Sequence, residues 1–235
     1  MTTPPAFRRE EPDARRAALI AACARVLARD GAAGASVRAI ALEAGVSPGL
    51  VGHYFAGIDA LVAATYAQVG ARVDAALDDA LAAAGADPRA RLEAFVTASF
   101  AAPIADGELL ATWIAFWSLV RARADIAAQH DAQYAAYRAR LEGLLGACGL
   151  EAQRLRHAAI ALTALVDGLW LELCLSPGCF TPEEAGAMAR AQIVAVIPHT
   201  RHSREGGEAE LASANPSPDL SIVVTSGDGP RPSRG

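Results

Sequence analysis

Aromatic side chains and a carboxylate recur at helical spacing in two stretches of the sequence. ATWIAFW places Trp113, Phe116 and Trp117 three and four residues apart, so one helical face carries all of them. LVDGLWLE likewise places Asp167 and Trp170 on one face, and the two stretches hold all three Trp of the chain. Aromatic faces beside a carboxylate can hold a quaternary ammonium ion through cation–π attraction and charge. We therefore predict that these five residues bind such a ligand. An ordinary helix core or a dimer contact is the alternative.

A stretch nearer the start of the chain has the residue types of a DNA-contacting motif. SVRAIALEAGVSPGLVGHYF, residues 36–55, is typical of two short helices joined by a tight turn. Gly45 ends the first helix, where glycine adopts a left-handed backbone without steric cost. Ser47, which precedes a proline, is predicted to cap the second helix. Val51 and Phe55 lie four residues apart and face inward. The pattern predicts a helix-turn-helix whose second helix enters the DNA major groove.

The predicted second helix exposes mostly small side chains. Pro48, Gly49 and Gly52 supply almost no hydrogen-bond donors, but they let the helix backbone come close to the bases. His53 is the one polar candidate for a base contact on this surface. Phosphate contacts position a protein without reading sequence, and we expect them from Ser47, Arg38 and Tyr54. The full predicted DNA-binding set is Ser36, Arg38, Ser47, Pro48, Gly49, Gly52, His53 and Tyr54.

The segments on both sides of this motif carry a resemblance to a known family. TetR-family transcriptional regulators have a first helix, a helix-turn-helix and a fourth helix that resemble, in order, ARRAALIAACARVLARDG, GASVRAIALEAGVSPGLVGHYF and IDALVAATY, all between Asp13 and Tyr66. The resemblance implies an N-terminal DNA-binding domain and a C-terminal domain for ligand binding and dimerisation. It also implies a homodimer on a palindromic operator, because two-fold symmetry places two recognition helices in successive major grooves. Repression is the activity that the family implies.

Three segments narrow the resemblance to one branch of the family. GLVGHYF, ATWIAFW and LVDGLWLE are similar to segments of the choline-responsive repressors of the glycine-betaine pathway. The implied effector is choline or a related cation. One position departs from the family: a Lys is common three residues after the Tyr-Phe pair, and Ile58 stands there. We expect weaker or less salt-dependent DNA binding, since each lost phosphate contact lowers the salt slope by about one unit.

The remaining pattern predicts an all-α fold of about nine helices. We expect a disordered arm over 1–11, the DNA-binding domain over 12–66, a helical ligand-binding and dimerisation domain over 67–197, and a disordered tail over 198–235. A strand-like SIVVT at 221–225 lies alone in that tail. The predicted helices span about 12–30, 58–84, 88–103, 125–148, 151–175 and 182–197, with the two short helices of the motif and one beginning near 107. The last two predicted helices have apolar faces that are wider than the other helices of the 67–197 domain would cover. A dimer interface would cover the remainder.

Composition sets outer bounds on function. The chain of 235 residues has 21 Arg, no Lys, 26 acidic residues and a net charge of −5. Residues 1–60 hold seven Arg and six acidic residues, so this N-terminal part is slightly basic whereas the rest of the chain is acidic. We call the predicted DNA-binding domain the head and the predicted domain after it the body. Neither a secretory signal nor a transmembrane run is recognisable, which predicts a cytoplasmic protein without a membrane partner. Neither the Cys nor the His residues have metal-ligand spacing, so we expect buried free thiols and no metal or cofactor: Cys23, Cys148, Cys174, Cys179; His53, His130, His157, His199 and His202.

Two other classes of protein compete with this interpretation. An enzyme would need a matched constellation, and the carboxylates of Asp167 and Glu172 lie five residues apart, pointing in different directions on a helix. No phosphate loop or nucleophile elbow is present, so we predict no catalytic residues. The second rival is a helical small-molecule-binding module with a weak or vestigial DNA-binding head, which Ile58 and the glycine-rich second helix keep open. The operator, the regulated genes and the identity of the effector have no signature in the sequence.

Overall fold

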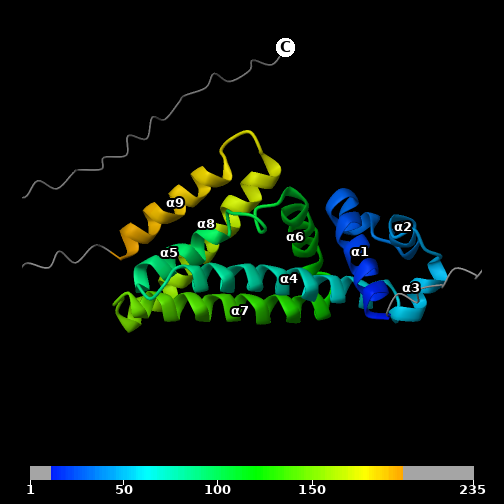
Figure 1. Cartoon of the computed structure of the whole chain (residues 1–235), viewed down its shortest axis with the longest axis horizontal. Helices are drawn as coiled ribbons and strands as arrows, with labels where there is room; N and C mark the ends of the chain where they lie inside the picture. Colours follow the sequence, from blue (N-terminus) through cyan, green and yellow to red (C-terminus); the bar gives the residue numbers. More distant parts are fainter. Residues whose placement is uncertain (1–11, 198–235) are drawn as a thin grey trace, which may run out of the picture. The chain divides into compact units, whose positions relative to one another are not determined.

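The computed structural model describes residues 12–197 and contains nine helices and no strand in that range. The all-α prediction is confirmed. The predictions for 1–11, for 198–235 with its SIVVT segment, and for His199 and His202 lie outside the described residues. Figure 1 shows the helices, which in chain order are α1 (Pro12–Gly34), α2 (Val37–Glu43), α3 (Pro48–Tyr54), α4 (Ile58–Ala83), α5 (Pro88–Ala98), α6 (Gly107–Val120), α7 (Ala124–Ala147), α8 (Ala152–Leu175) and α9 (Pro182–Val196).

The first three helices pack around a small apolar core. One face of α1 contributes Leu19, Cys23 and Val26, all fully buried, and Val51 of α3 meets them from the other side. Gly31 has φ 67° and interrupts α1 where the sequence predicts its end, although helical turns resume up to Gly34. The apolar periodicity of α1 therefore explains why it forms and which face it buries.

The turn between α2 and α3 confirms the helix-turn-helix. Gly45 has φ 66°, the left-handed conformation that glycine adopts at low cost, and the Val46 N–H donates to the carbonyl of Ala41 at 2.9 Å. Ser36 caps α2, because its Oγ accepts from the Ala39 N–H at 3.1 Å. Ser47 occupies the N-cap position of α3, but its side chain makes no capping hydrogen bond. The prediction that the Ser47 side chain caps α3 is therefore wrong. Its hydroxyl is exposed on the surface.

The helices after α3 build the body. Figure 1 shows α4 and α7 side by side, while α6 contacts both α1 and α8. The predicted helix over 88–103 is too long, since α5 ends at Ala98 and tight turns follow. Pro103 lacks an N–H and disfavours helical backbone at the residue before it, so a helix cannot continue through this segment.

The last two helices leave large apolar side chains exposed. α9 begins at a capping box, in which Thr181 and Glu184 satisfy each other's backbone N–H groups, as the sequence predicts. Among the described helices, α8 is the one long and apolar enough to cross a membrane, and a third of its most apolar window is buried. The exposed hydrophobic residues of this pair are Ile160, Leu171, Leu175, Met188 and Val194. An apolar surface of this kind on two neighbouring helices is typical of a protein interface.

Candidate functional site

A cavity of about 50 Å³ lies among α4, α6, α7 and α8. Its volume exceeds what a single water needs by a few times, so it suits a small ligand. Trp113 of α6 and Trp170 of α8 line it and meet edge to face, with ring centroids 6.0 Å apart. Trp170 Nε1 donates to the carbonyl of Ser99 at 2.8 Å, and Trp113 stacks on Tyr66 at 5.6 Å. The two indoles are therefore held in place, Trp170 by Ser99 at the cavity wall and Trp113 by Tyr66 outside the lining.

A carboxylate lies in the same cavity. Asp167 Oδ1 accepts a hydrogen bond from Tyr134 Oη at 3.0 Å, and Tyr134 Oη accepts one from Trp117 Nε1 at 3.2 Å. Burial raises the pKa of the Asp167 carboxyl to about 6, against the hydrogen bond from Tyr134 that lowers it. At neutral pH the group is therefore mostly ionised, but its negative charge has little solvent around it. A cation in the cavity would offset the free-energy cost of holding this negative charge away from water.

The structure separates the five residues predicted to bind a ligand into two groups. Trp113, Asp167 and Trp170 line the cavity, whereas Phe116 and Trp117 do not. Phe116 is fully buried and packs edge to face on Tyr66 at 4.8 Å. Because other helices contact α6 on several sides, its three aromatic side chains pack against different neighbours. Trp117 contacts the site only through Tyr134.

Several lining residues come from α4 and α7, which the sequence analysis did not implicate. Tyr134 and Tyr137 are three residues apart on α7, and this spacing was the available signal. Asp74 lies at the cavity edge and pairs with Arg140 at 3.6 Å, while burial raises the pKa of its carboxyl. No local pattern singles out Asp74 or Gln133, because their place at the site depends on the contact between α4 and α7.

The predicted DNA-binding residues lie together on the head, on α2, α3 and the turn that joins them. A Cβ added at Gly49 or Gly52 would meet nothing within 4 Å, which leaves that side of α3 open. His53 is exposed and meets Tyr54 edge to face at 5.1 Å. The remaining predicted residues of this face are exposed, namely Ser36, Arg38, Ser47 and Pro48.

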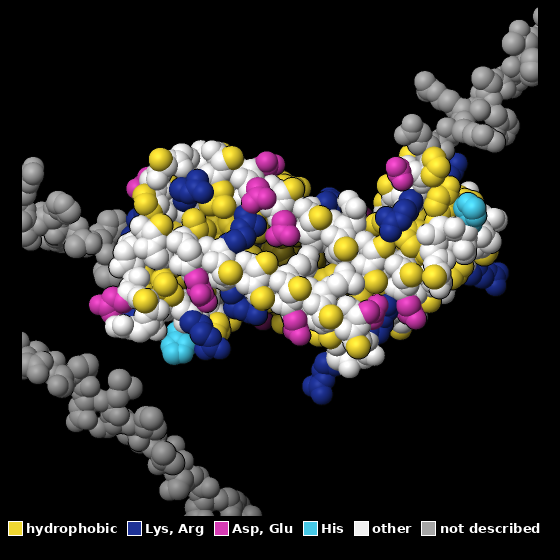
Figure 2. Space-filling model, turned by 90° about the horizontal axis from the view of Figure 1, so that it is seen from below, with side chains coloured by type: hydrophobic (Ala, Val, Ile, Leu, Met, Phe, Trp, Pro, Cys, Tyr) yellow, Lys and Arg dark blue, Asp and Glu magenta, His cyan; other side chains and the backbone are white. Residues whose placement is uncertain are grey.

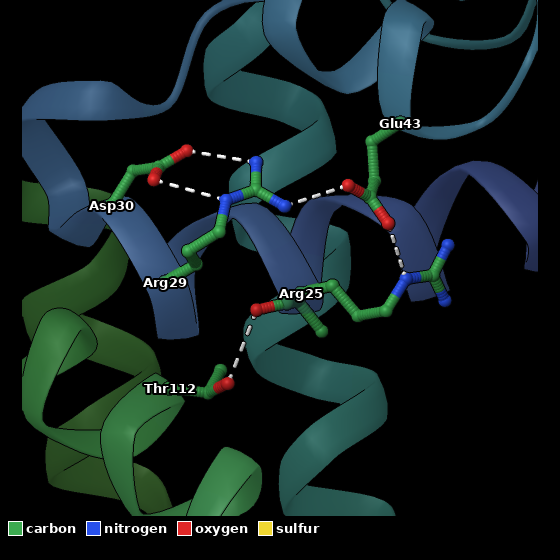
Figure 3. Close-up of polar contacts among 6 residues, drawn as sticks. Arg25, Arg29, Asp30, Glu43 and Thr112 are labelled. Atoms are coloured by element: carbon green, nitrogen blue, oxygen red, sulfur yellow. Dashed lines mark hydrogen bonds and ion pairs between the residues drawn. The ribbon is translucent and has the colours of Figure 1, made fainter.

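The head is braced by an ion-pair network that the sequence did not reveal (Figure 3). Glu43 at the end of α2 accepts from Arg25 Nε at 2.7 Å and from Arg29 at 2.8 Å, both on α1. Arg29 also pairs with Asp30. Both arginines hold the pKa of Glu43 below its ordinary value. In the same view, Thr112 Oγ1 of α6 lies 3.2 Å from the carbonyl oxygen of Ala24 in α1, which links the body to the head. Its single proton is shared with the carbonyl of Glu108 in α6, 2.8 Å away.

Within residues 12–197, few arginines are placed beside α3. Arg16 of α1 lies over the Phe55 ring at 5.0 Å, close to the end of α3. Ile58 begins α4 and is half-buried, so it supplies no charge there. Its neighbour Asp59 pairs with Arg123 at 2.9 Å. Figure 2 shows Arg and acidic side chains interspersed over the face drawn, without a broad basic patch.

The thiols and imidazoles show no catalytic arrangement in the described part of the chain. Cys23 is buried and free, and burial raises the pKa of its thiol to about 11. Cys148 and Cys174 are half-buried, while Cys179 is exposed, so the expectation of buried thiols is wrong for Cys179. Between residues 12 and 197, no three His, Cys, Asp or Glu side chains gather as a metal site requires.

Comparison with known proteins agrees with this geometry over both parts of the chain. A family model described as bacterial regulatory proteins of the tetR family matches residues 19–65, and one described as the C-terminal part of BetI-type transcriptional repressors matches 88–198. The regulator BetI of Paraburkholderia phytofirmans is 37% identical over 186 residues, which are 78% of this chain and 93% of that protein. The chain belongs to the TetR family, with a BetI-type C-terminal domain.

Solved structures place this TetR-family chain among regulators of the same fold. A transcriptional regulator from Pseudomonas aeruginosa is 43% identical, covers 81% of this chain and 93% of its own, and has a TM-score of 0.73. A regulator from Saccharomonospora viridis, whose crystal structure is a complex with choline, shares the fold with a TM-score of 0.67 at 19% identity, over 77% of this chain and 96% of its own. The TetR-family chain is therefore a DNA-binding transcriptional regulator and not an enzyme.

Proposed function

We propose that this regulator is a dimeric repressor that binds a palindromic operator and releases it when a quaternary ammonium cation such as choline fills the cavity. The observation that carries the ligand is the partly buried carboxylate of Asp167 beside the edge-to-face pair Trp113 and Trp170. Cation–π attraction and charge both favour a cation with a methylated, weakly hydrated head. The choline held by the Saccharomonospora viridis regulator supports the same ligand class.

The ligand site is proposed to consist of more than the residues that touch the cation. Trp113, Asp167 and Trp170 would contact it, together with Tyr134 and Tyr137 of α7. The predicted residues Phe116 and Trp117 would act indirectly, by supporting Tyr66 and Tyr134. A ring that is already held in place loses little conformational entropy when the ligand binds, which favours affinity.

DNA binding is proposed to follow the predicted residues of α2 and α3. Pro48, Gly49 and Gly52 would bring the backbone of α3 close to the bases, and His53 would reach a base edge. The phosphates would be held by Ser36, Arg38, Ser47 and Tyr54. Ile58 supplies no charge at the start of α4, so affinity would depend more on close fit and less on ion release than in a member with Lys.

Dimerisation is proposed to use the exposed apolar side chains of α8 and α9. Two copies related by two-fold symmetry would bury Leu171, Leu175 and Val194 and would present two α3 helices to successive major grooves. The proposed domain boundaries are 12–66 for DNA binding and 67–197 for ligand binding and dimerisation. Access to chromosomal DNA implies a cytoplasmic location.

The test is DNA binding by fluorescence anisotropy to the upstream region of the regulator's own gene, at two salt concentrations, with and without choline. Tight binding released by choline is the expected result. Tight binding that choline leaves unchanged would overturn the effector and keep the regulator. Binding to this and other candidate operators no tighter than to random DNA would favour the alternative, a ligand-binding module with a vestigial head.

A further inference from the structure

Two polar atoms on one face of α7 line the cavity without a hydrogen bond of normal geometry. Gln133 and Tyr137 lie four residues apart, so their side chains are neighbours on the helix surface. Both side chains line the cavity. Gln133 Oε1 and Tyr137 Oη are buried, and neither makes a hydrogen bond of normal geometry among residues 12–197. The Ser99 side chain interacts with the Tyr137 hydroxyl closely enough to lower its pKa, against the burial that raises it. Buried polar atoms of folded proteins are normally paired, so this pair calls for an explanation in terms of function.

Both side chains are held in position by packing. Gln133 lies directly on Gly70 of α4, where an added Cβ would fall 1.4 Å from Gln133 Nε2. In this rotamer the amide, which is the end of a flexible side chain, occupies the space that a side chain at position 70 would need. The Tyr137 ring stacks on Phe95, with centroids 5.1 Å apart and an interplanar angle of 30°. The Tyr137 hydroxyl is therefore presented to the cavity by a ring that is held in place, and the Gln133 amide packs against α4 beside it.

The chemistry of the pair is complementary to an alcohol. A tyrosine hydroxyl donates a hydrogen bond, an amide carbonyl accepts one, and an alcohol can do both at once. We propose that Gln133 and Tyr137 form a subsite for the hydroxyl of a quaternary ammonium alcohol, whose charged head lies against Trp113, Trp170 and Asp167. This inference rests on the proposed function. It specifies that α7 recognises the hydroxyl end of the ligand and that Gln133 and Tyr137 do so.

The same subsite rejects the carboxylate that oxidation of such an alcohol produces. A carboxylate offers only acceptors, so it leaves Gln133 Oε1 unpaired while the amide keeps the orientation in which Nε2 faces Gly70. Asp74 and Asp167 also line the cavity, and no basic side chain does so among the described residues. A negatively charged end would meet like charge and an unpaired carbonyl, which is how binding sites exclude close analogues. The regulator therefore distinguishes a precursor alcohol from its oxidised zwitterionic product.

The experiment compares three ligands on the full chain by titration calorimetry at pH 7.5. Choline has the charged head and the hydroxyl, tetramethylammonium has the head alone, and glycine betaine has a carboxylate in place of the hydroxyl. The variants are Tyr137→Phe and Gln133→Leu, which remove one polar group each and keep similar volume. Tyr134→Phe is the matched control on the same helix, since it releases Asp167 and leaves the subsite intact. Thermal melts confirm that each variant is folded.

We expect the unmodified protein to bind choline about tenfold more tightly than tetramethylammonium, and to bind glycine betaine least. Tyr137→Phe and Gln133→Leu each lower choline affinity several-fold and leave tetramethylammonium affinity unchanged, whereas Tyr134→Phe lowers both together. Equal binding of choline and tetramethylammonium by the unmodified protein would overturn the hydroxyl subsite. It would leave intact the proposal that Trp113, Trp170 and Asp167 bind the cation, which we call the cage. An equal loss for both cations in Tyr137→Phe would do the same. Failure of every cation to bind would overturn the cage and the subsite together.

Discussion

Asp167 combines burial with a charge that the cavity itself does not neutralise. Its carboxylate accepts a hydrogen bond from Tyr134, and burial raises its pKa to about 6. A cation binds the ionised form and therefore lowers this pKa on binding. The affinity for a cation must then fall as the pH drops through about 6, because protons compete for the same carboxylate.

We predict that choline affinity falls about tenfold between pH 7 and pH 5, in proportion to the ionised fraction of Asp167. Asp167→Asn should bind choline at least tenfold more weakly at pH 7 and should remove most of the pH dependence. The measurement is a tryptophan fluorescence titration over this range. Burial lowers the pKa of His130, whose ring lies 4.1 Å from that of Tyr134. A shallower pH dependence that remains in Asp167→Asn would therefore report this imidazole. An unaltered slope would contradict the role of Asp167.

Ile58 is the residue at which the head departs from its family. We predict that Ile58→Lys adds one phosphate contact, which strengthens operator binding at low salt and steepens the dependence of log affinity on log salt by about one unit. Ile58→Gln is the matched control, because it removes the apolar side chain without adding charge. Anisotropy titrations at several salt concentrations give the slope. Equal slopes for the two variants would show that position 58 does not face a phosphate.

At the scale of elements, two helices connect the cavity to the head. α4 begins three residues after Phe55 and contributes Gly70 and Val73 to the cavity. α6 contributes Trp113, and the adjacent Thr112 donates to the carbonyl of Ala24 in α1. α1 in turn holds α2 through the ion pairs to Glu43. A ligand that shifts α6 would therefore move the DNA-binding domain through α1. This route adds to the one through α4.

We predict that Thr112→Val weakens this second connection without damaging either site. Valine keeps the shape of threonine but donates neither to Ala24 nor to Glu108 of its own helix. Because the backbone of α6 is unchanged, choline and operator should each bind within about threefold of the unmodified protein when tested alone. The ability of choline to release the operator should fall, because a coupling free energy depends on the elements between two sites. Thr112→Ser retains the hydroxyl and should behave as the unmodified protein. Full release by choline in Thr112→Val would assign the coupling to α4.

At the scale of the whole molecule, α8 serves two surfaces at once. Asp167 and Trp170 reach the cavity, and the adjoining face, which begins beside Asp167, exposes Ile160, Leu171 and Leu175. The apolar side chains of this helix extend beyond the face that the rest of the body covers, which a helix buried on one side alone does not require. A second copy of the chain would cover the exposed face.

We predict that Leu171→Glu converts a dimer to a monomer and lowers operator affinity at least tenfold, since the two half-sites are then no longer bound as a unit. Analytical ultracentrifugation and anisotropy titration measure the two effects. Leu42→Glu is the control for oligomeric state, because Leu42 is 82% exposed on α2 and far in sequence from α8. A dimeric Leu171→Glu would place the interface elsewhere.

The local fold could be predicted from the sequence, because its causes are local. Apolar periodicity predicts α1 and α4, Gly45 marks the tight turn, and Thr181 with Glu184 marks the start of α9. Where prediction failed, a local detail was misjudged: α5 ends at Ala98, ahead of Pro103, and Ser47 does not bond its helix. The family resemblance rested on the same local segments.

Only the tertiary structure decided which side chains meet. The sequence placed Trp113, Phe116 and Trp117 on one helical face, but it could not show that α6 is enclosed on several sides and that Trp113 alone of the three lines the cavity. Tyr137 and Gln133 entered the site because α7 packs beside α4, where Gly70 makes room for the amide. Contacts between helices distant in the sequence depend on the packing of whole faces, which residue spacing within one helix does not specify.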